Sequence, residues 1–473
     1  MSAPAPRPAA NFAVLSAGEI GARLLTFVAM IVLTRGLGVA GFGLLAFGLA
    51  TVAYVELAVG FGLGILGQLE VARGKTPVRN LIGAIVTIRL AMVVVAFVAL
   101  AVVLRWAPLS DPARSVTLLF GIVILPRAIQ LDWALLGAEQ MAPVARSQVL
   151  AESFLALGVV ALVRSPDDLL RVPLIYLTAR AVLVVLQGHS AWLRFGFPRA
   201  LPDPRLARRL FREAAPVAAT IGCGHLYYTF DLVLLGVVAG AEASGLYGAS
   251  HRLFLLLLIL THAYAVSLRP ALGWASERGY ARVEPLVESS LRLTVAAAVG
   301  VAAGGSILAR PILVFLFGPA FGAGAPALAL LCLGFVLHVA NRQYRDLLVA
   351  FRHQRTELRV VAAGAALNVP LALLLASSHG AVGAAAATLV AEALVLVLSI
   401  RAARQRVSLT LPRLPWARAV LCGLVLAAFV YVIDGPHVLL RIALGAALYV
   451  GLCLATGVAR PRDVRRLLGL AGA

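Results

Sequence analysis

Charged and aromatic residues are both scarce in this chain of 473 residues. Charged side chains make up 13% of it and aromatic side chains 7%, whereas 61% of the residues are hydrophobic. Soluble domains are about 25% charged and about 45–50% apolar, so the composition excludes an ordinary soluble protein. Apolar stretches of about twenty residues recur along the chain, and a helix of that length crosses the hydrocarbon core of a bilayer. The composition therefore predicts an integral membrane protein.

Cysteine is also rare, and its positions exclude the usual metal and redox motifs. The four cysteines have no CxxC spacing and no flanking histidine, so we interpret them as small buried residues. The sequence also has no metal-binding motif, nucleophile elbow or phosphate-binding loop. We therefore expect no cofactor and no metal, and we expect a protein that is not an enzyme. A membrane-embedded polysaccharide polymerase or ligase stays an alternative, although such enzymes carry a large extracytoplasmic loop.

Hydropathy predicts an all-α, polytopic membrane protein of about 14 transmembrane helices. Each predicted span has about 16–25 residues, which at 1.5 Å per residue suits a bilayer core about 30 Å thick. The spans are Asn11–Thr34, Gly43–Leu66, Leu81–Leu104, Val116–Ala138, Val144–Val163, Val172–Leu193, Ala214–Val238, Ser244–Leu268, Leu286–Leu308, Pro326–Val349, Leu358–Ala376, Gly380–Ser399, Trp416–Ile433 and Val438–Val458.

Lysine is almost absent, and the basic charge is carried by arginine. The net charge is +20. With the amino terminus in the cytoplasm, 26 basic residues fall in inside segments and seven in outside segments. The positive-inside rule therefore predicts that both termini are cytoplasmic. Because topology and contact with anionic lipids explain this charge, we expect no nucleic-acid partner.

Eight arginines remain inside the predicted spans, where each is costly to place in contact with lipid. Some have an acidic residue four positions away on the same helix, as Arg23 has Glu19 and Arg342 has Asp346. For Arg89 and Arg292, near cytoplasmic ends, snorkelling to the head groups is an alternative explanation. The surplus of arginine over acid favours a cationic cavity and an anionic substrate, because guanidinium binds pyrophosphate bidentately. The eight are Arg23, Arg89, Arg127, Arg180, Arg252, Arg292, Arg342 and Arg345.

An internal duplication favours a transporter. Gly43-Leu44 and Gly245-Leu246 match at an offset of 202 residues, and LLGAEQ (135–140) weakly matches LLVAFR (347–352). Two related six-helix halves around a central cavity, plus two C-terminal helices, are typical of transporters that alternate access. The predicted domains are an N-terminal half, a basic cytoplasmic hinge, a C-terminal half, and an extra helix pair with a basic tail. Their ranges are 1–193, 194–213, 214–402 and 403–473.

The chain resembles the polysaccharide (oligosaccharidyl-lipid, O-antigen type) flippases of the multidrug/oligosaccharidyl-lipid/polysaccharide exporter superfamily. The resemblance covers most of the chain and rests on the order and spacing of several short motifs. One departure is that relatives often carry an acid just before the Gly-Leu pair that ends the second span, whereas Glu56 lies further upstream here. The motifs are TRGLGVAGFGLLAFGLA (34–50), GFGLG (60–64), LEVAR (69–73), FDLVLLGVVAGAEASGLYGASHRL (230–253), LARPILVFLFGPAFGAGAPALALL (308–331), ALN (366–368) and HGAVGAAAATLVAE (379–392).

The resemblance implies a flippase in the bacterial cytoplasmic membrane that moves an undecaprenyl-pyrophosphate-linked oligosaccharide to the outer leaflet. The lipid bilayer and glycan polymerase or assembly proteins would be its other partners. Arg23 and Arg252 are the first candidates for pyrophosphate contact. A lipid II flippase and a drug/cation antiporter of the same superfamily are the alternatives. Further head-group candidates are Arg127, Arg180, Arg342 and Arg345. Candidates for ion or proton coupling are Glu19, Glu56, Asp231, His251 and His262.

Overall fold

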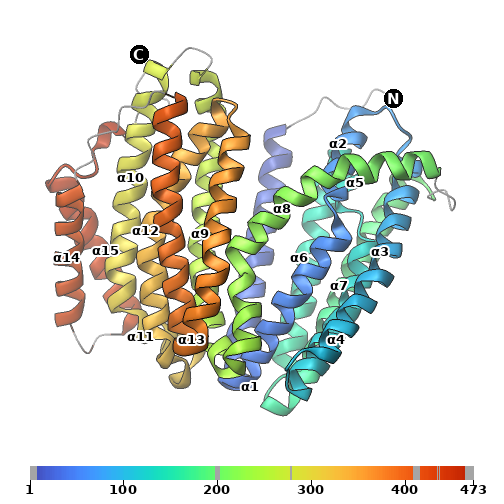
Figure 1. Cartoon of the computed structure of the whole chain (residues 1–473), viewed down its shortest axis with the longest axis horizontal. Coiled ribbons are helices and arrows are strands. Elements are labelled where there is room, and N and C mark those ends of the chain that lie inside the picture. Colours follow the sequence, from blue (N-terminus) through green and yellow to red (C-terminus); the bar gives the residue numbers. More distant parts are fainter. Residues whose placement is uncertain are drawn as a thin grey trace. The chain divides into compact units, whose positions relative to one another are not determined.

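The computed structural model describes residues 8–197, 203–276, 280–407, 416–433, 435 and 437–463, and within these ranges all regular structure is helical (Figure 1). Ten helical stretches of the described chain are long and apolar enough to cross a membrane, or eleven when one bent helix pair is counted as a span. Two of the ten each join two helices at a glycine of positive φ, Gly38 (67°) and Gly380 (53°). These observations confirm the all-α membrane fold, and the segments agree with the predicted number of about fourteen.

The helices group into two compact units, Met1–His225 and Leu226–Ala473. The boundary between the units lies within α8 (Pro204–Val238), in the seventh predicted span. The first unit also contains α1 (Pro8–Gly60), α2 (Leu63–Arg73), α3 (Val78–Trp106), α4 (Asp111–Ala128), α5 (Asp132–Gly137), α6 (Met141–Leu162), the short 3₁₀ helix η1 (Pro166–Leu170) and α7 (Arg171–Phe195). The second unit contains α9 (Gly240–Ser276), α10 (Tyr280–Ile307), α11 (Ala309–Phe317), the 3₁₀ helix η2 (Pro319–Gly324), α12 (Ala325–Ala350), α13 (Gln354–Val407), α14 (Trp416–Val432) and α15 (Val438–Ala455).

In the first unit, α1 packs closely against α6 because small residues line the contact. A Cβ atom added to Gly18 would lie only 2.6 Å from the Cβ atom of Ala145. Such close approach of two backbones is common between membrane helices. Van der Waals packing between small residues drives their association, because lipid offers no hydrophobic driving force. The buried face of α1 therefore points at α6, and the side chains of the opposite face, including Arg23, are exposed.

Two predicted spans of the first unit are interrupted. The second span breaks at Phe61 and Gly62, both of positive φ (42° and 69°), before α2 begins. The fourth divides into α4 and α5, because Pro126 in the last turn of α4 cannot donate a helical hydrogen bond. Polar residues next to both interruptions line one pocket, which is described below.

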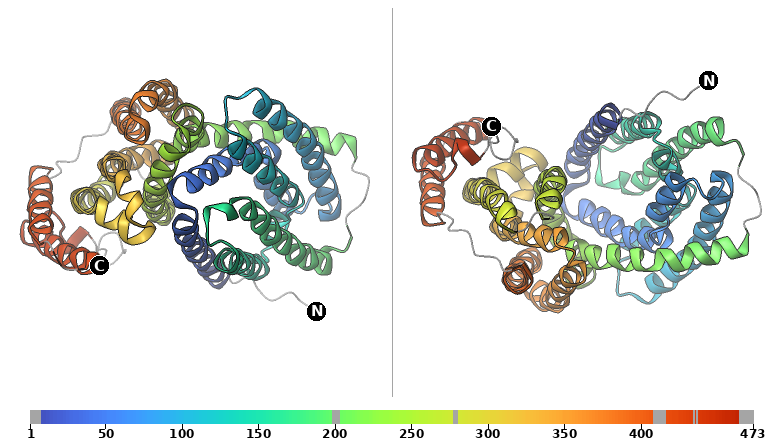
Figure 2. Two further views of the ribbon diagram at one scale, coloured as in Figure 1. Left: turned by 90° about the horizontal axis from the view of Figure 1, so that it is seen from below. Right: turned by 90° about the horizontal axis from the view of Figure 1, so that it is seen from above.

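In the second unit, α12 contacts α9, α10 and α13, and its buried face supplies much of the core. The predicted extra pair, α14 and α15, packs beside α10 at the edge of this unit (Figure 2). The Tyr449 hydroxyl of α15 donates a hydrogen bond to the Ala296 carbonyl of α10 (2.7 Å). Cys332, Cys422 and Cys453 are buried free thiols, which confirms their interpretation as small buried residues, whereas Cys223 is half-buried.

The backbone supports the internal duplication and corrects part of its alignment. Gly38 and Gly240 both have positive φ (67° and 83°) and are separated by the predicted 202 residues. The weaker match is shifted by one residue, because the turn at Glu139 (φ 57°) corresponds to the turn at Arg352 (φ 62°) rather than to the turn at Phe351. In each turn the following amide donates to a carbonyl five residues back (2.8 and 2.7 Å), as in a Schellman motif.

Candidate functional site

A buried carboxylate in the second unit is surrounded by three hydrogen-bond donors from two other helices. Asp231 of α8 is 2% exposed. Its carboxylate accepts hydrogen bonds from the Tyr247 hydroxyl (3.0 Å), the Thr388 hydroxyl (2.8 Å) and the Asn368 side-chain amide (3.1 Å). Each donor compensates part of the cost of burying a charge in an apolar environment. This Asp231 cluster connects α8, α9 and both parts of α13.

His251 is one helical turn from Tyr247 and stacks on its ring, with centroids 5.4 Å apart and an interplanar angle of 18°. The structure therefore brings His251 close to Asp231 through Tyr247. The other histidine of the predicted coupling path, His262, has a side chain outside the described residues.

A second buried carboxylate, Glu392 of α13, lies four residues after Thr388. It is 0% exposed, and its two oxygens contact two residues of α12. His338 Nδ1 lies 3.0 Å from one oxygen, and the Asn341 side-chain amide donates to the other. This Glu392 cluster ties α12 to the part of α13 that follows Gly380. The site residues predicted from the sequence include none of Glu392, His338 and Asn341.

Three of the predicted head-group arginines form ion pairs. Arg342 Nε lies 3.0 Å from Asp346, which confirms the pairing that the spacing of four residues predicts. Arg345 Nη2 lies 2.5 Å from Glu357 at the start of α13. Arg180 of α7 pairs with Glu152 of α6 at 3.1 Å, and the same Glu152 accepts a hydrogen bond from Thr26 of α1 (2.8 Å). These arginines connect neighbouring turns or helices.

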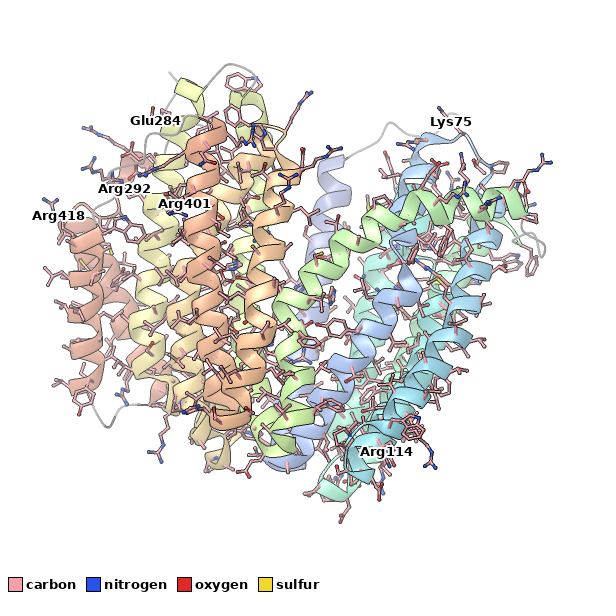
Figure 3. All side chains as sticks on the ribbon, viewed as in Figure 1. Lys75, Arg114, Glu284, Arg292, Arg401 and Arg418 are labelled. Carbon is pink, nitrogen blue, oxygen red and sulfur yellow. The ribbon has the colours of Figure 1, made fainter. Side chains whose placement is uncertain are left out.

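The remaining predicted sites differ in exposure. Arg23 and Glu19 both lie on the exposed face of α1, and the described structure does not pair them despite their spacing of four residues. Arg252 is half-buried in α9. Snorkelling is wrong for Arg89 and Arg292, because each is 7% exposed. Arg292, labelled in Figure 3, lies near the middle of α10 and pairs with Glu288 (2.9 Å) and Asp463 (3.6 Å).

Polar residues of the first unit line a pocket with a volume of about 400 Å³. Arg127, at the end of α4, donates a hydrogen bond to the side-chain oxygen of Gln130, and both line this pocket. Asp132, in the same predicted span as Arg127, belongs to the next helix, α5. The other polar lining residues are Glu56, Gln68, Arg89, Asp132, Trp133 and His225.

Comparison with known proteins places the chain among membrane proteins of polysaccharide biosynthesis and transport. A protein of Haloferax volcanii, named a probable low-salt glycan biosynthesis flippase, is 23% identical over 381 residues, which are 79% of each chain. A protein of Escherichia coli strain K12, whose name gives it as an O-antigen transporter, is 20% identical over 391 residues, or 80% of this chain and 91% of the other.

Two solved structures share the fold. The lipid II flippase MurJ, in an inward closed conformation, has a TM-score of 0.77 at 14% identity and covers 93% of this chain and 97% of its own. An inward-facing multidrug resistance transporter of the MATE family has a TM-score of 0.68 at 14% identity, over 82% and 94% of the two chains. The family model described as polysaccharide biosynthesis protein matches residues 9–274, more than half of the sequence. The chain therefore belongs to the polysaccharide biosynthesis protein family.

Proposed function

We propose that this protein is a flippase that moves a polyprenyl-pyrophosphate-linked oligosaccharide from the cytoplasmic to the outer leaflet by alternating access. The family match carries the proposal, and the names of both sequence relatives agree with it. A sugar head group and a pyrophosphate cannot cross hydrocarbon unaided, because each unsatisfied polar group there costs several kcal/mol. A polytopic helical protein with arginines within its spans supplies the polar surface that such a head group needs.

The contacts assign a structural role to three of the six candidate head-group arginines. Arg180, Arg342 and Arg345 are held by carboxylates of the same unit, so we assign them to helix packing. Arg23 is exposed on α1, and Arg252 is half-buried on α9. We assign the pyrophosphate contact to Arg23 and Arg252, because the resemblance to the flippase family makes them the first candidates.

We further propose that the protein lies in the bacterial cytoplasmic membrane with both termini in the cytoplasm. The charges within each unit support this orientation (Figure 3). In the first unit, Lys75 and Arg114 lie near opposite ends of the helices, as expected for a cytoplasmic and an outside loop. In the second unit, Arg401 and Arg418 lie toward the same end, as expected for one cytoplasmic loop.

Transport in proteoliposomes tests the proposed function. We expect the purified protein to expose a labelled polyprenyl-pyrophosphate oligosaccharide to a membrane-impermeant glycosidase, at a rate well above that in protein-free liposomes. Lipid II should be included as a second substrate, because the fold resembles that of a lipid II flippase. Transport of lipid II alone would favour that alternative, and transport of neither lipid would contradict the proposal.

We propose that Asp231 couples transport to a cation gradient. An ionisable residue buried inside a membrane bundle is a functional candidate by default. Replacing Asp231 with asparagine keeps the size of the side chain but removes its charge. We expect an imposed proton or sodium gradient to lose its stimulation of transport, so that the rates with and without the gradient become equal. The measurement compares transport with and without each gradient.

The matched control is Glu242→Gln, since Glu242 is an exposed acid of α9. This variant should respond to the gradient as the wild-type protein does. If a gradient stimulates the Asp231→Asn variant as much as the wild type, Asp231 has no part in coupling. This conclusion holds whichever lipid the protein transports.

A further inference from the structure

The polar pocket of the first unit has donors that no protein group satisfies. Arg89 is 7% exposed and Trp133 is 2% exposed. Arg89 Nε and the indole Nε1 of Trp133 are nevertheless buried without a hydrogen-bond partner among the described residues. One further contact of Arg89, from Nη1 to the Gln130 carbonyl, is long at 3.4 Å. Because buried polar groups are nearly always satisfied, these two donors indicate a ligand that accepts hydrogen bonds.

The glycine-rich segment GFGLGILG (60–67) shapes this pocket. A Cβ atom at Gly64 would lie 3.1 Å from Arg89 Nη2, and one at Gly67 would lie 2.5 Å from Cε3 of Trp133. Larger residues at these positions would push the guanidinium and the indole away. The glycines therefore have a definite role, which is to let α2 approach the side chains that carry the unsatisfied donors.

The charged residues that line the pocket are balanced in sign. Arg89 and Arg127 contribute two positive charges, and Glu56 and Asp132 contribute two carboxylates. The carboxylates would repel a pyrophosphate, and the arginines would repel an organic cation. A group with many hydroxyls fits both kinds of residue, because each hydroxyl both donates and accepts a hydrogen bond. A volume of about 400 Å³ lies at the lower end of small-molecule pockets, which measure about 300–1,000 Å³.

We propose that this pocket binds one neutral sugar unit of the glycan head group. The sugar hydroxyls accept hydrogen bonds from Arg89 Nε and Trp133 Nε1 and donate to Glu56 and Asp132. The inference rests on the proposed function and adds to it a sugar-recognition site within the first unit, separate from the residues assigned to the pyrophosphate.

Binding of two lipid probes to the purified full-length protein tests this proposal. The probes are a short-chain polyprenyl pyrophosphate and the same lipid carrying one N-acetylglucosamine. We expect the sugar-bearing probe to bind about 30- to 150-fold more tightly, because two or three added hydrogen bonds of about 1 kcal/mol each amount to about that factor. The variants Arg89→Gln and Glu56→Gln should each lose most of this difference while their affinity for the bare pyrophosphate stays unchanged.

Arg105→Gln is the matched control, since Arg105 is an exposed arginine of α3 outside the pocket. It should keep the preference for the sugar-bearing probe. Equal binding of the two probes by the wild-type protein would overturn the sugar site and leave the proposed function standing. Retention of the preference in both pocket variants would also overturn it. Binding of neither probe would overturn the sugar site and the proposed function together.

Discussion

Replacing Glu392 with alanine is expected to lower the free energy of unfolding by about 2–5 kcal/mol, because two buried polar groups lose their partner at about 1–3 kcal/mol each. Glu392 is fully buried, and its oxygens contact His338 Nδ1 and the Asn341 amide. Alanine would leave both groups of α12 without their acceptor in an environment that offers no water. Reversible unfolding of the purified protein in mixed detergent micelles measures the change.

Two further variants separate this effect from a general effect of mutation. Glu242→Ala removes an exposed acid and should change the unfolding free energy by less than about 0.5 kcal/mol. The double variant His338→Phe with Glu392→Met replaces the pair by apolar side chains, and we expect it to recover the part of the loss that comes from His338, since the Asn341 amide still lacks its acceptor. A Glu392→Ala variant as stable as Glu242→Ala would show that the cluster does not stabilise the fold.

The polar contacts that could be predicted from the sequence are those made within one helix. Arg342 and Asp346 are four residues apart, so helical periodicity alone places them on one face. Glu392 and His338 are 54 residues apart, and Asp231 and Thr388 are 157 apart. Hydropathy predicts that each of these residues is buried but does not say which helices become neighbours. The partners of buried acids therefore required the tertiary structure.

Arg89 shows a second limit of hydropathy. Its place near a span end allows snorkelling, and nothing in the pattern of apolar residues argues against it. The side chain is instead buried, because glycines of α2 leave room for it and the broken fourth span brings Gln130 near. Small residues such as glycine allow helices to pack closely, but composition does not say which residue fills the space that they leave.

The all-helical fold, the number of spans and the position of the strongest repeat were all predictable, because they depend on hydropathy and on glycine. The Gly38 and Gly240 breaks lie five residues before the matching Gly-Leu pairs, so the repeated sequence and the repeated backbone agree. The second repeat was misaligned by one residue, because its turn is formed by Glu139 in one copy and Arg352 in the other. Non-glycine residues of positive φ have no clear sequence signal.

The double variant Arg23→Ala with Arg252→Ala is expected to reduce transport of the lipid-linked oligosaccharide by about 100-fold or more. A hydrogen bond to a charged group contributes about 1.5–3 kcal/mol, and about 1.4 kcal/mol corresponds to a factor of ten. Each arginine therefore accounts for about a tenfold or larger effect when it contacts the pyrophosphate. Initial rates in proteoliposomes with equal amounts of folded protein measure the change.

The same exchange at exposed arginines elsewhere in each unit provides the control. Arg105→Ala and Arg310→Ala remove equal charge from α3 and α11. These variants should transport within about twofold of the wild-type rate, because surface charges contribute little. Arg342→Ala leaves Asp346 without its ion-pair partner. We expect this variant to be less stable than the wild type, whereas the protein that remains folded should transport at a nearly normal rate. Normal transport by the Arg23→Ala, Arg252→Ala double variant would exclude both residues from pyrophosphate binding, and a larger loss in Arg342→Ala than in the double variant would move that role to α12.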